Sequence, residues 1–185
     1  MDDVRWLSPE ETDAWIRTAG LLIRLPSRID AAMTARCGIT FFEYSLLSVL
    51  SEQPDRSLQM SEVARATASS LSRLSHVAGR LEKRGLITRT RACGGPGRRT
   101  TATLTEAGLS MVEQVAPEHL AIVRELVVDR LEPEEFATFG ALAARIAGDV
   151  RFGRPGSDGD CGDDDGDGVE TGQCGEASAP STPST

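Results

Sequence analysis

The sequence predicts a mainly α-helical fold with one small β-hairpin, and three observations support this class. Apolar residues recur at spacings of three and four along most of residues 10–150, which is the period of one helix face. Two threonine-rich runs, 86–91 and 100–104, flank a loop of glycine and proline, as the strands of a hairpin do. Beyond residue 152 almost no large apolar side chain remains, so we expect that segment to be disordered.

The first predicted helix spans Glu10 to about Arg36 and is followed by a second helix with a clear start signal. Pro26 lies inside the first helix and removes a hydrogen bond, so we expect a bend or a break there. Gly38 is expected to end this helix. Residues 40–43 (TFFE) form a capping box, which opens a second helix that stops near residues 53–55.

Two shorter helices and the hairpin come next along the chain. The helices are predicted at about residues 60–66 and 69–84, and Gly85 ends the second. Ala68 lies between them, where a tight turn requires a small residue. Residues 58–85 therefore match the pattern of a helix-turn-helix.

Two further helices complete the predicted order of four helices, a hairpin and two helices. Thr105 caps the fifth, which we expect to reach about Leu131 with a bend at Pro117. The sixth begins with Pro133 in its first turn, where the missing N–H has no cost, and continues to Val150.

The charge distribution identifies one face of this chain as a candidate for contact with phosphates. The formal net charge of the 185 residues is −8, yet residues 65–99 hold nine cationic side chains and a single acidic one, Glu82. Clustered lysine and arginine are the electrostatic signature of nucleic-acid binding. An ordinary solvated surface, which is the alternative interpretation, would mix charges of both signs.

Helix 69–84 divides into two faces at 100° per residue. The apolar face, which we expect in the core, consists of Leu71, Leu74, Val77, Ala78 and Leu81. The residues predicted to contact DNA are Ser69, Ser70, Ser72, Arg73, His76, Arg80 and Lys83. Serine, arginine and histidine suit base edges in the major groove, whereas Arg80 and Lys83 suit phosphates.

The hairpin directly after this helix strengthens the prediction, because a helix-turn-helix followed by a wing is a coherent DNA-docking unit. Arg98 and Arg99 lie at the far side of the hairpin tip, where a cationic wing reaches the adjacent minor groove. In the alternative interpretation, these two arginines only aid solubility.

Four segments together resemble the MarR-type (multiple antibiotic resistance) transcriptional regulators. They are residues 61–64 (SEVA), 71–74 (LSRL), 80–87 (RLEKRGLI) and 104–108 (LTEAG). The resemblance covers nearly all of residues 10–150. It implies a homodimer of six-helix winged helix-turn-helix chains, a palindromic operator on double-stranded DNA, and a small-molecule or oxidant signal.

The resemblance, together with the composition of the C-terminal segment, predicts a division of the chain into four parts. Residues 1–39 are an N-terminal dimerisation segment, 40–104 the DNA-binding domain, 105–152 the C-terminal dimerisation helices, and 153–185 an acidic disordered tail. The wing departs from the family in one place. The family usually has aspartate two residues before the wing arginine, and here that position is Pro96.

Several residues are candidates for receiving a signal. Trp15, Phe41, Phe42 and Tyr44 cluster near the junction of the first two helices, where the resemblance implies an aromatic effector and where core packing is the alternative.

Two cysteines suggest a different function, a thiol-based redox-sensing regulator. Cys37 follows Arg36, which would favour a thiolate, and Cys93 lies in the wing. Burial as a small packing residue is the other interpretation of Cys37. A third possible function is a winged-helix module that binds protein and has lost DNA binding.

Other function classes have little support in this sequence. No run of eighteen apolar residues and no signal sequence occur, so we expect a cytoplasmic protein with no membrane partner. His76 and His119 lack a nucleophile or metal partner at a suggestive spacing, so we expect no enzyme and no cofactor. Residues 163–168 match half of a calcium loop, but Cys174 stands at its twelfth position, so no metal site is expected.

Residues 151–185 carry a net charge of −6, and we hypothesise that this tail competes with DNA for the basic face.

Overall fold

The computed structural model describes residues 4–91 and 99–148, within which the chain forms six α-helices, one 3-10 turn and a three-stranded sheet. The elements in chain order are α1 (Pro9–Cys37), α2 (Phe41–Ser51), β1 (Ser57–Gln59), α3 (Met60–Ala66), α4 (Leu71–Lys83), β2 (Ile87–Arg91), β3 (Thr100–Leu104), α5 (Glu106–Leu126), η1 (Val128–Arg130) and α6 (Pro133–Ala147). The predicted class, mainly α with a small hairpin and six helices, is confirmed for this part of the chain.

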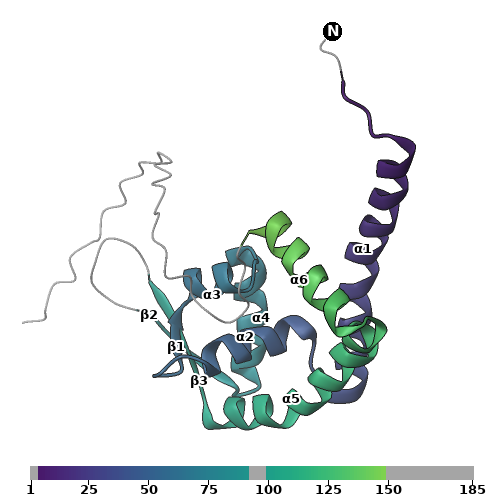
Figure 1. Cartoon of the computed structure of the whole chain (residues 1–185). Helices are drawn as coiled ribbons and strands as arrows, with labels where there is room; N and C mark the ends of the chain where they lie inside the picture. Colours follow the sequence, from purple (N-terminus) through teal and green to yellow (C-terminus); the bar gives the residue numbers. More distant parts are fainter. Residues whose placement is uncertain (1–3, 92–98, 149–185) are drawn as a thin grey trace, which may run out of the picture.

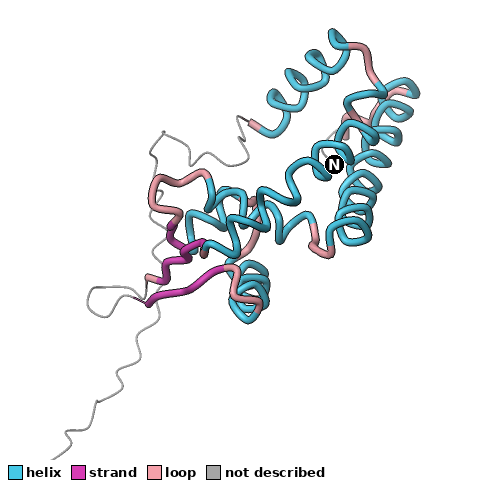
Figure 2. Tube along the Cα trace, turned by 90° about the horizontal axis from the view of Figure 1, so that it is seen from below, coloured by secondary structure: helices cyan, strands magenta, loops and turns pink. Residues whose placement is uncertain are grey.

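The helix-turn-helix and the sheet occupy one side of the molecule, and α1 extends away from it on the other (Figure 1). Seen from below, the strands again lie at one end and the long helices at the other (Figure 2). Helix α2 lies between them, because it packs against α1, α3, α4, β3 and α5. Its Leu46, Leu47 and Leu50 are fully buried and form the centre of the core.

The core joins every element around α2. The largest fully buried side chains from other elements are Met33 of α1, Val63 of α3, Leu74 and Leu81 of α4, Ile87 of β2 and Ile122 of α5. Removing such side chains from water is the main favourable contribution to folding. Helix α4 is therefore held on the core by its apolar face, and its opposite face is left for solvent.

The sheet has the antiparallel order β1-β3-β2. The sequence predicted the hairpin strands β2 and β3 but not β1. Ser57 of β1 pairs with Thr103 of β3, and their hydroxyl oxygens lie 2.7 Å apart. A strand of three residues is too short to show a hydrophobic alternation, so the pattern in the sequence gave no signal for it. The hairpin itself, β2 with β3, is confirmed, and its tip at residues 92–98 lies outside the described residues.

The structure differs from the predictions at one helix end and at a proline inside a helix. Helix α1 continues through Pro26 as one helix, so of the two predicted outcomes, a bend or a break, the break is wrong. Helix α5 continues through Pro117, where only a bend was predicted. A proline removes one hydrogen bond, and both helices have enough other bonds and packing to continue. Helix α5 ends at Leu126 rather than near Leu131, and a 3-10 turn follows it.

The start of α5 fixes the wing to the core. Thr105 caps the helix by accepting a hydrogen bond from the Gly108 N–H at 3.1 Å, and its hydroxyl also donates to the Gly85 carbonyl at 2.7 Å. Gly108 packs so closely on the Leu86 carbonyl that a Cβ atom there would overlap it. Only glycine allows this approach between α5 and the chain entering β2.

Candidate nucleic-acid interface

The turn before α4 is stabilised by short polar side chains. Ala68 has a positive φ of 48°, and the Thr67 hydroxyl lies 3.0 Å from that of Ser69. Ser70 is the N-cap of α4, because its Oγ accepts a hydrogen bond from the Arg73 N–H at 3.3 Å. Two of the serines predicted to contact DNA therefore also build the turn that orients α4.

The faces of α4 agree with the prediction at all but one position. Leu74, Val77, Ala78 and Leu81 are buried as expected. The expectation for Leu71 is wrong, since 56% of this residue is exposed. It is the first residue of α4 and lies beyond the last core layer, where it lines a cavity of about 450 Å³ between α4 and the sheet.

The residues of the predicted DNA face are exposed with one exception. Ser70, Ser72, Arg73, His76, Arg80 and Lys83 are exposed, and Ser69 is half-buried. Side chains from the first and last turns of the helix thus reach the same surface. An exposed helix face of this length, with three cations and several hydroxyls, suits the major groove of a DNA duplex.

Arg73 has a partner that the sequence analysis did not identify. Its guanidinium lies over the ring of Phe42 in α2, with Cζ 4.4 Å from the ring centroid. This is the geometry of a cation–π contact. Phe42 was predicted in a ligand pocket, and the structure instead places it beneath the arginine most suited to reading bases.

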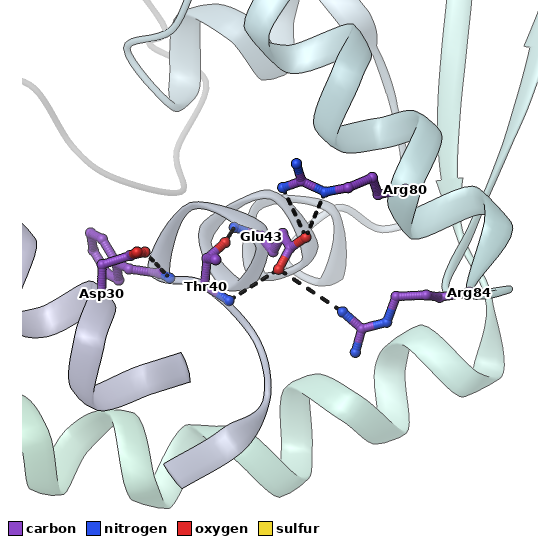
Figure 3. Close-up of polar contacts among 6 residues, drawn as sticks. Asp30, Thr40, Glu43, Arg80 and Arg84 are labelled. Atoms are coloured by element: carbon purple, nitrogen blue, oxygen red, sulfur yellow. Dashed lines mark hydrogen bonds and ion pairs between the residues drawn. The ribbon is translucent and has the colours of Figure 1, made fainter. Parts of the chain in front are cut away.

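Arg80 also has a partner in α2. Its Nε and Nη2 donate to Glu43 Oε1 at 3.2 and 3.1 Å (Figure 3). The Arg80 side chain remains 59% exposed, whereas that of Glu43 is only 8% exposed. Arg84 approaches the other oxygen of the same carboxylate at 3.9 Å. Arg80 can therefore contact a phosphate in two ways. Its guanidinium binds the phosphate and the Glu43 carboxylate at the same time, or it first leaves the carboxylate.

Glu43 is ionised in this environment. Burial acts to raise the pKa of its carboxyl, but hydrogen bonds from Thr40 and the Arg80 guanidinium outweigh burial, so the net pKa is below its ordinary value. The Thr40 N–H donates to Oε2 at 3.0 Å, which closes the predicted capping box. A fixed negative charge thus lies beneath the cationic end of α4.

The single acid of the basic stretch is also paired. Glu82 of α4 accepts from the Arg89 guanidinium at 2.7 Å and from its backbone N–H at 3.1 Å, which attaches α4 to β2. Arg91 and Arg99 are exposed and line the cavity between α4 and the sheet. The predicted contact by Arg98 lies outside the described residues, as do Pro96 and Cys93.

The predicted aromatic cluster is divided in the structure. Phe41 and Tyr44 line a cavity of about 320 Å³, together with Ser48, Glu52 and His119. The His119 ring lies between them, with centroids 5.6 Å from Phe41 and 4.8 Å from Tyr44. Trp15 is exposed on the N-terminal half of α1 and does not line this cavity, and Phe42 faces α4.

His119 was not selected by the sequence analysis as part of this cavity. Its Nδ1 is buried and has no hydrogen-bond partner among the described residues. Burial lowers the pKa of its imidazole, so the ring is held neutral. A polar atom without a partner, beside two aromatic rings, suits a ligand that is aromatic and carries one polar group.

Cys37 lies in surroundings that disfavour a thiolate. Burial and the nearby Glu118 raise the pKa of the thiol, although Arg36 acts in the opposite direction. Arg36 is itself paired with Glu125 of α5 at 2.7 Å. The sequence analysis weighed Arg36 against burial, and in the structure burial and Glu118 outweigh Arg36, so the pKa shift expected from Arg36 is reversed.

Two helices expose apolar faces that are not covered by any of residues 4–91 and 99–148. The exposed apolar residues are Trp15, Ile16, Leu21, Leu22 and Ile23 on α1, and Phe136, Phe139, Leu142 and Ile146 on α6. Helix α6 buries none of its residues and makes no extensive contact with another described element. Large apolar side chains exposed in such number on two helices are typical of an interface between protein chains.

The described residues give no sign of a metal centre or a membrane span. In residues 4–91 and 99–148, no three histidine, cysteine or acidic side chains group to hold a metal ion. None of the helices in this part of the chain has both the length and the apolar character to cross a membrane. The half calcium loop at residues 163–168 and the acidic tail lie outside the described residues.

Comparisons with known proteins point to one family. A family model described as the MarR family matches residues 38–99. The structure of Sco3205 from Streptomyces coelicolor, a MarR family transcriptional regulator in complex with DNA, is 35% identical with a TM-score of 0.73, and the match covers 80% of this chain and 91% of that one. The structure of AbsC, a MarR family transcriptional regulator from the same organism, is 35% identical with a TM-score of 0.70, covering 78% and 96%.

A more distant structure shares the fold. BpsR from Bordetella bronchiseptica is 22% identical with a TM-score of 0.62, and the match covers 71% of this chain and 98% of that one. No match was found among curated proteins.

Proposed function

The chain belongs to the MarR family of transcriptional regulators, and from this premise we propose that it is a repressor that binds an inverted-repeat operator as a homodimer and releases it when a small aromatic ligand binds. The observation that carries the proposal is the exposed face of α4, where Arg73, His76 and Lys83 surround short hydroxyls. That Sco3205 was solved with DNA supports the same role for this chain.

A second copy of this chain suits the apolar faces of α1 and α6. Joining these faces would remove from water side chains such as Ile23, which is 72% exposed in the single chain. A two-fold dimer presents two α4 helices to one side of the duplex. Their half-sites would then lie about 10 base pairs apart, centre to centre, in an inverted repeat.

The cavity at Phe41, Tyr44 and His119 is the proposed ligand site. Its aromatic walls suit a flat ring, and the buried Nδ1 of His119 offers one polar contact. Phenol and benzoate are the simplest probes of this chemistry. We expect one of them to lower affinity for the operator, and His119→Leu to reduce that response.

The decisive experiment measures DNA binding and its dependence on salt. Sequences selected from random duplexes supply the operator, and fluorescence anisotropy then gives dissociation constants for operator and scrambled duplexes. We expect the logarithm of the association constant to fall with the logarithm of the salt concentration, with a slope of about −0.9 for each phosphate contacted. Arg73→Ala should cost about 1–3 kcal/mol and relax sequence preference. Arg124→Ala, a change at an exposed arginine of α5 away from α4 and from the proposed dimer faces, is the matched control.

Two outcomes would overturn the proposal. Absence of salt-dependent duplex binding would favour a winged-helix module that binds protein. Release of the operator by peroxide, together with an oxidised cysteine in the intact mass, would favour the redox-sensing regulator acting through Cys37 or Cys93.

A further inference from the structure

The first turn of α2 contacts α4 at two of its arginines. Phe42 lies under Arg73, and Glu43 accepts hydrogen bonds from Arg80. These contacts join residues that are more than thirty positions apart in the chain. The neighbouring Phe41 and Tyr44 instead line the cavity with His119. One helical turn therefore has one side against α4 and another against the cavity.

The Phe42 contact restrains the direction of Arg73. An exposed arginine has many accessible rotamers, and most of them depart from the geometry needed to bind a base edge with two hydrogen bonds. An aromatic ring 4.4 Å from Cζ covers one face of the guanidinium and leaves its edge N–H groups available. The ring thus orients Arg73 without using the donors that read DNA.

The Glu43 contact restrains Arg80, because the carboxylate of Glu43 is itself held by the start of α2. The Thr40 N–H donates to Oε2 at 3.0 Å, and the Glu43 N–H donates to the Thr40 hydroxyl at 3.2 Å. The next residue, Phe41, donates its N–H to Asp30 of α1 at 2.9 Å, so the turn is tied to α1 as well (Figure 3). A carboxylate held this firmly fixes the guanidinium that binds it.

We propose that Phe42 and Glu43 are positioning residues that set the directions of Arg73 and Arg80, so that α2 contributes to operator preference through α4. This inference rests on the proposed function in one respect, the binding of DNA by α4. The two residues should act differently. Phe42 supports the reading of bases, whereas Glu43 withholds cationic charge from phosphates.

The experiment compares operator and scrambled duplexes for variants of both residues. Phe42→Leu removes the ring and keeps an apolar side chain, and Phe42→Tyr retains the ring as the conservative rescue. We expect Phe42→Leu to lower the ratio of operator to scrambled affinity about 2- to 5-fold, the value of a surface cation–π contact. Phe42→Tyr should restore the ratio of the native chain.

A double-mutant cycle separates positioning from a general loss of structure. If Phe42 acts through Arg73, Phe42→Leu should change the ratio no further in a chain that already carries Arg73→Ala. Arg73→Lys tests the same contact from the exposed side, where folding is not at risk. It should lower the ratio, because lysine lacks the planar group that stacks and binds bases with two hydrogen bonds.

A destabilised protein would bind DNA more weakly, whereas Glu43→Gln is expected to bind DNA more tightly. Glutamine retains the capping box but removes the negative charge, so it frees Arg80 and Arg84 for phosphates. Affinity for scrambled duplexes should rise, and the salt slope should steepen by about 0.9 for each arginine released. Arg80→Gln in the same chain should remove most of this change. Glu113→Gln, at an exposed acid of α5, is the matched control.

The outcomes distinguish this inference from the proposed function. The inference is overturned if Arg73→Ala lowers the ratio while Phe42→Leu and Glu43→Gln leave both the ratio and the salt slope unchanged. It is also overturned if the effect of Phe42→Leu persists in full beside Arg73→Ala. If the native chain itself shows no operator preference, the proposed function fails, and the inference fails with it.

Discussion

Two regions of the molecule bury their apolar side chains to opposite extents. One is the winged region, which we define as residues 41–104. The other is the pair of outer helices, residues 9–25 of α1 together with α6. Leu47 of α2 is fully buried, whereas Leu22 of α1 is 62% exposed. The two residues have the same side chain and both lie on α-helices. The difference teaches that one region completes its core within a single chain, and that the other is shaped for a second chain.

The largest expected effect is on the winged region. Leu47→Ala should lower the free energy of unfolding by about 2–5 kcal/mol, since it removes buried methyl groups and leaves a cavity. Urea unfolding followed by circular dichroism measures this change. The loss should not depend on protein concentration if the cavity lies inside one chain. A loss below about 1 kcal/mol would place Leu47 in a site that collapses easily.

The junction between the wing and α5 should show a smaller loss. Gly108→Ala places a methyl group on the Leu86 carbonyl, and we expect a cost of about 1–3 kcal/mol from the forced shift. Gly79→Ala in α4 is the matched control, because the nearest atom to its new methyl group would be 3.7 Å away in Arg89. That change should raise stability by up to about 1 kcal/mol through helix propensity. Equal effects at the two glycines would contradict the close approach at Gly108.

The outer helices should respond through association rather than folding. Leu22→Ala should weaken the proposed dimer by about 1–2 kcal/mol, or about 5- to 30-fold in its dissociation constant. Sedimentation equilibrium over a range of concentrations measures the constant, with Gln114→Ala of α5 as the exposed control. A native chain that sediments as a monomer would show that α1 and α6 face another partner.

The elements of the fold were predictable because their signals are local. Each signal lies within one or two helical turns: the capping box at residues 40–43, the N-cap Thr105, and the spacing of apolar residues by three and four. The strand β1 was missed because three residues carry no period. Leu71 was misplaced because a helical wheel takes no account of where the core ends along the helix axis.

The contacts of the candidate site were not predictable in the same way. Arg80 and Glu43 are 37 residues apart, and nothing in the sequence states that a capping glutamate will also bind an arginine of another helix. The pKa shift of Cys37 was likewise reversed by burial and by Glu118, which the fold brings near. The sequence predicted which side chains of α4 are exposed, Leu71 excepted, and the tertiary fold decides which of them are restrained.

The smallest expected effect concerns His119, at the point where α5 connects the winged region to the rest of the molecule. Burial lowers the pKa of its imidazole in the folded chain below the ordinary value of 6.5. The unfolded chain therefore takes up a proton more readily than the folded chain as the pH falls through 6.5. This uptake favours unfolding, so stability should decrease from pH 7 downward and level off once the folded imidazole is also protonated.

His119→Leu should remove this part of the pH dependence while keeping an apolar side chain between Phe41 and Tyr44. The native chain should therefore lose more stability than the variant between neutral and mildly acidic pH. Urea unfolding at pH 7.5 and at pH 5.5 measures it in a range where carboxylates such as Glu43 stay ionised. Parallel pH profiles for the two proteins would mean that His119 is solvated in the folded chain. In that case the cavity would be open to water, and its proposed preference for an aromatic ligand would lose its physical basis.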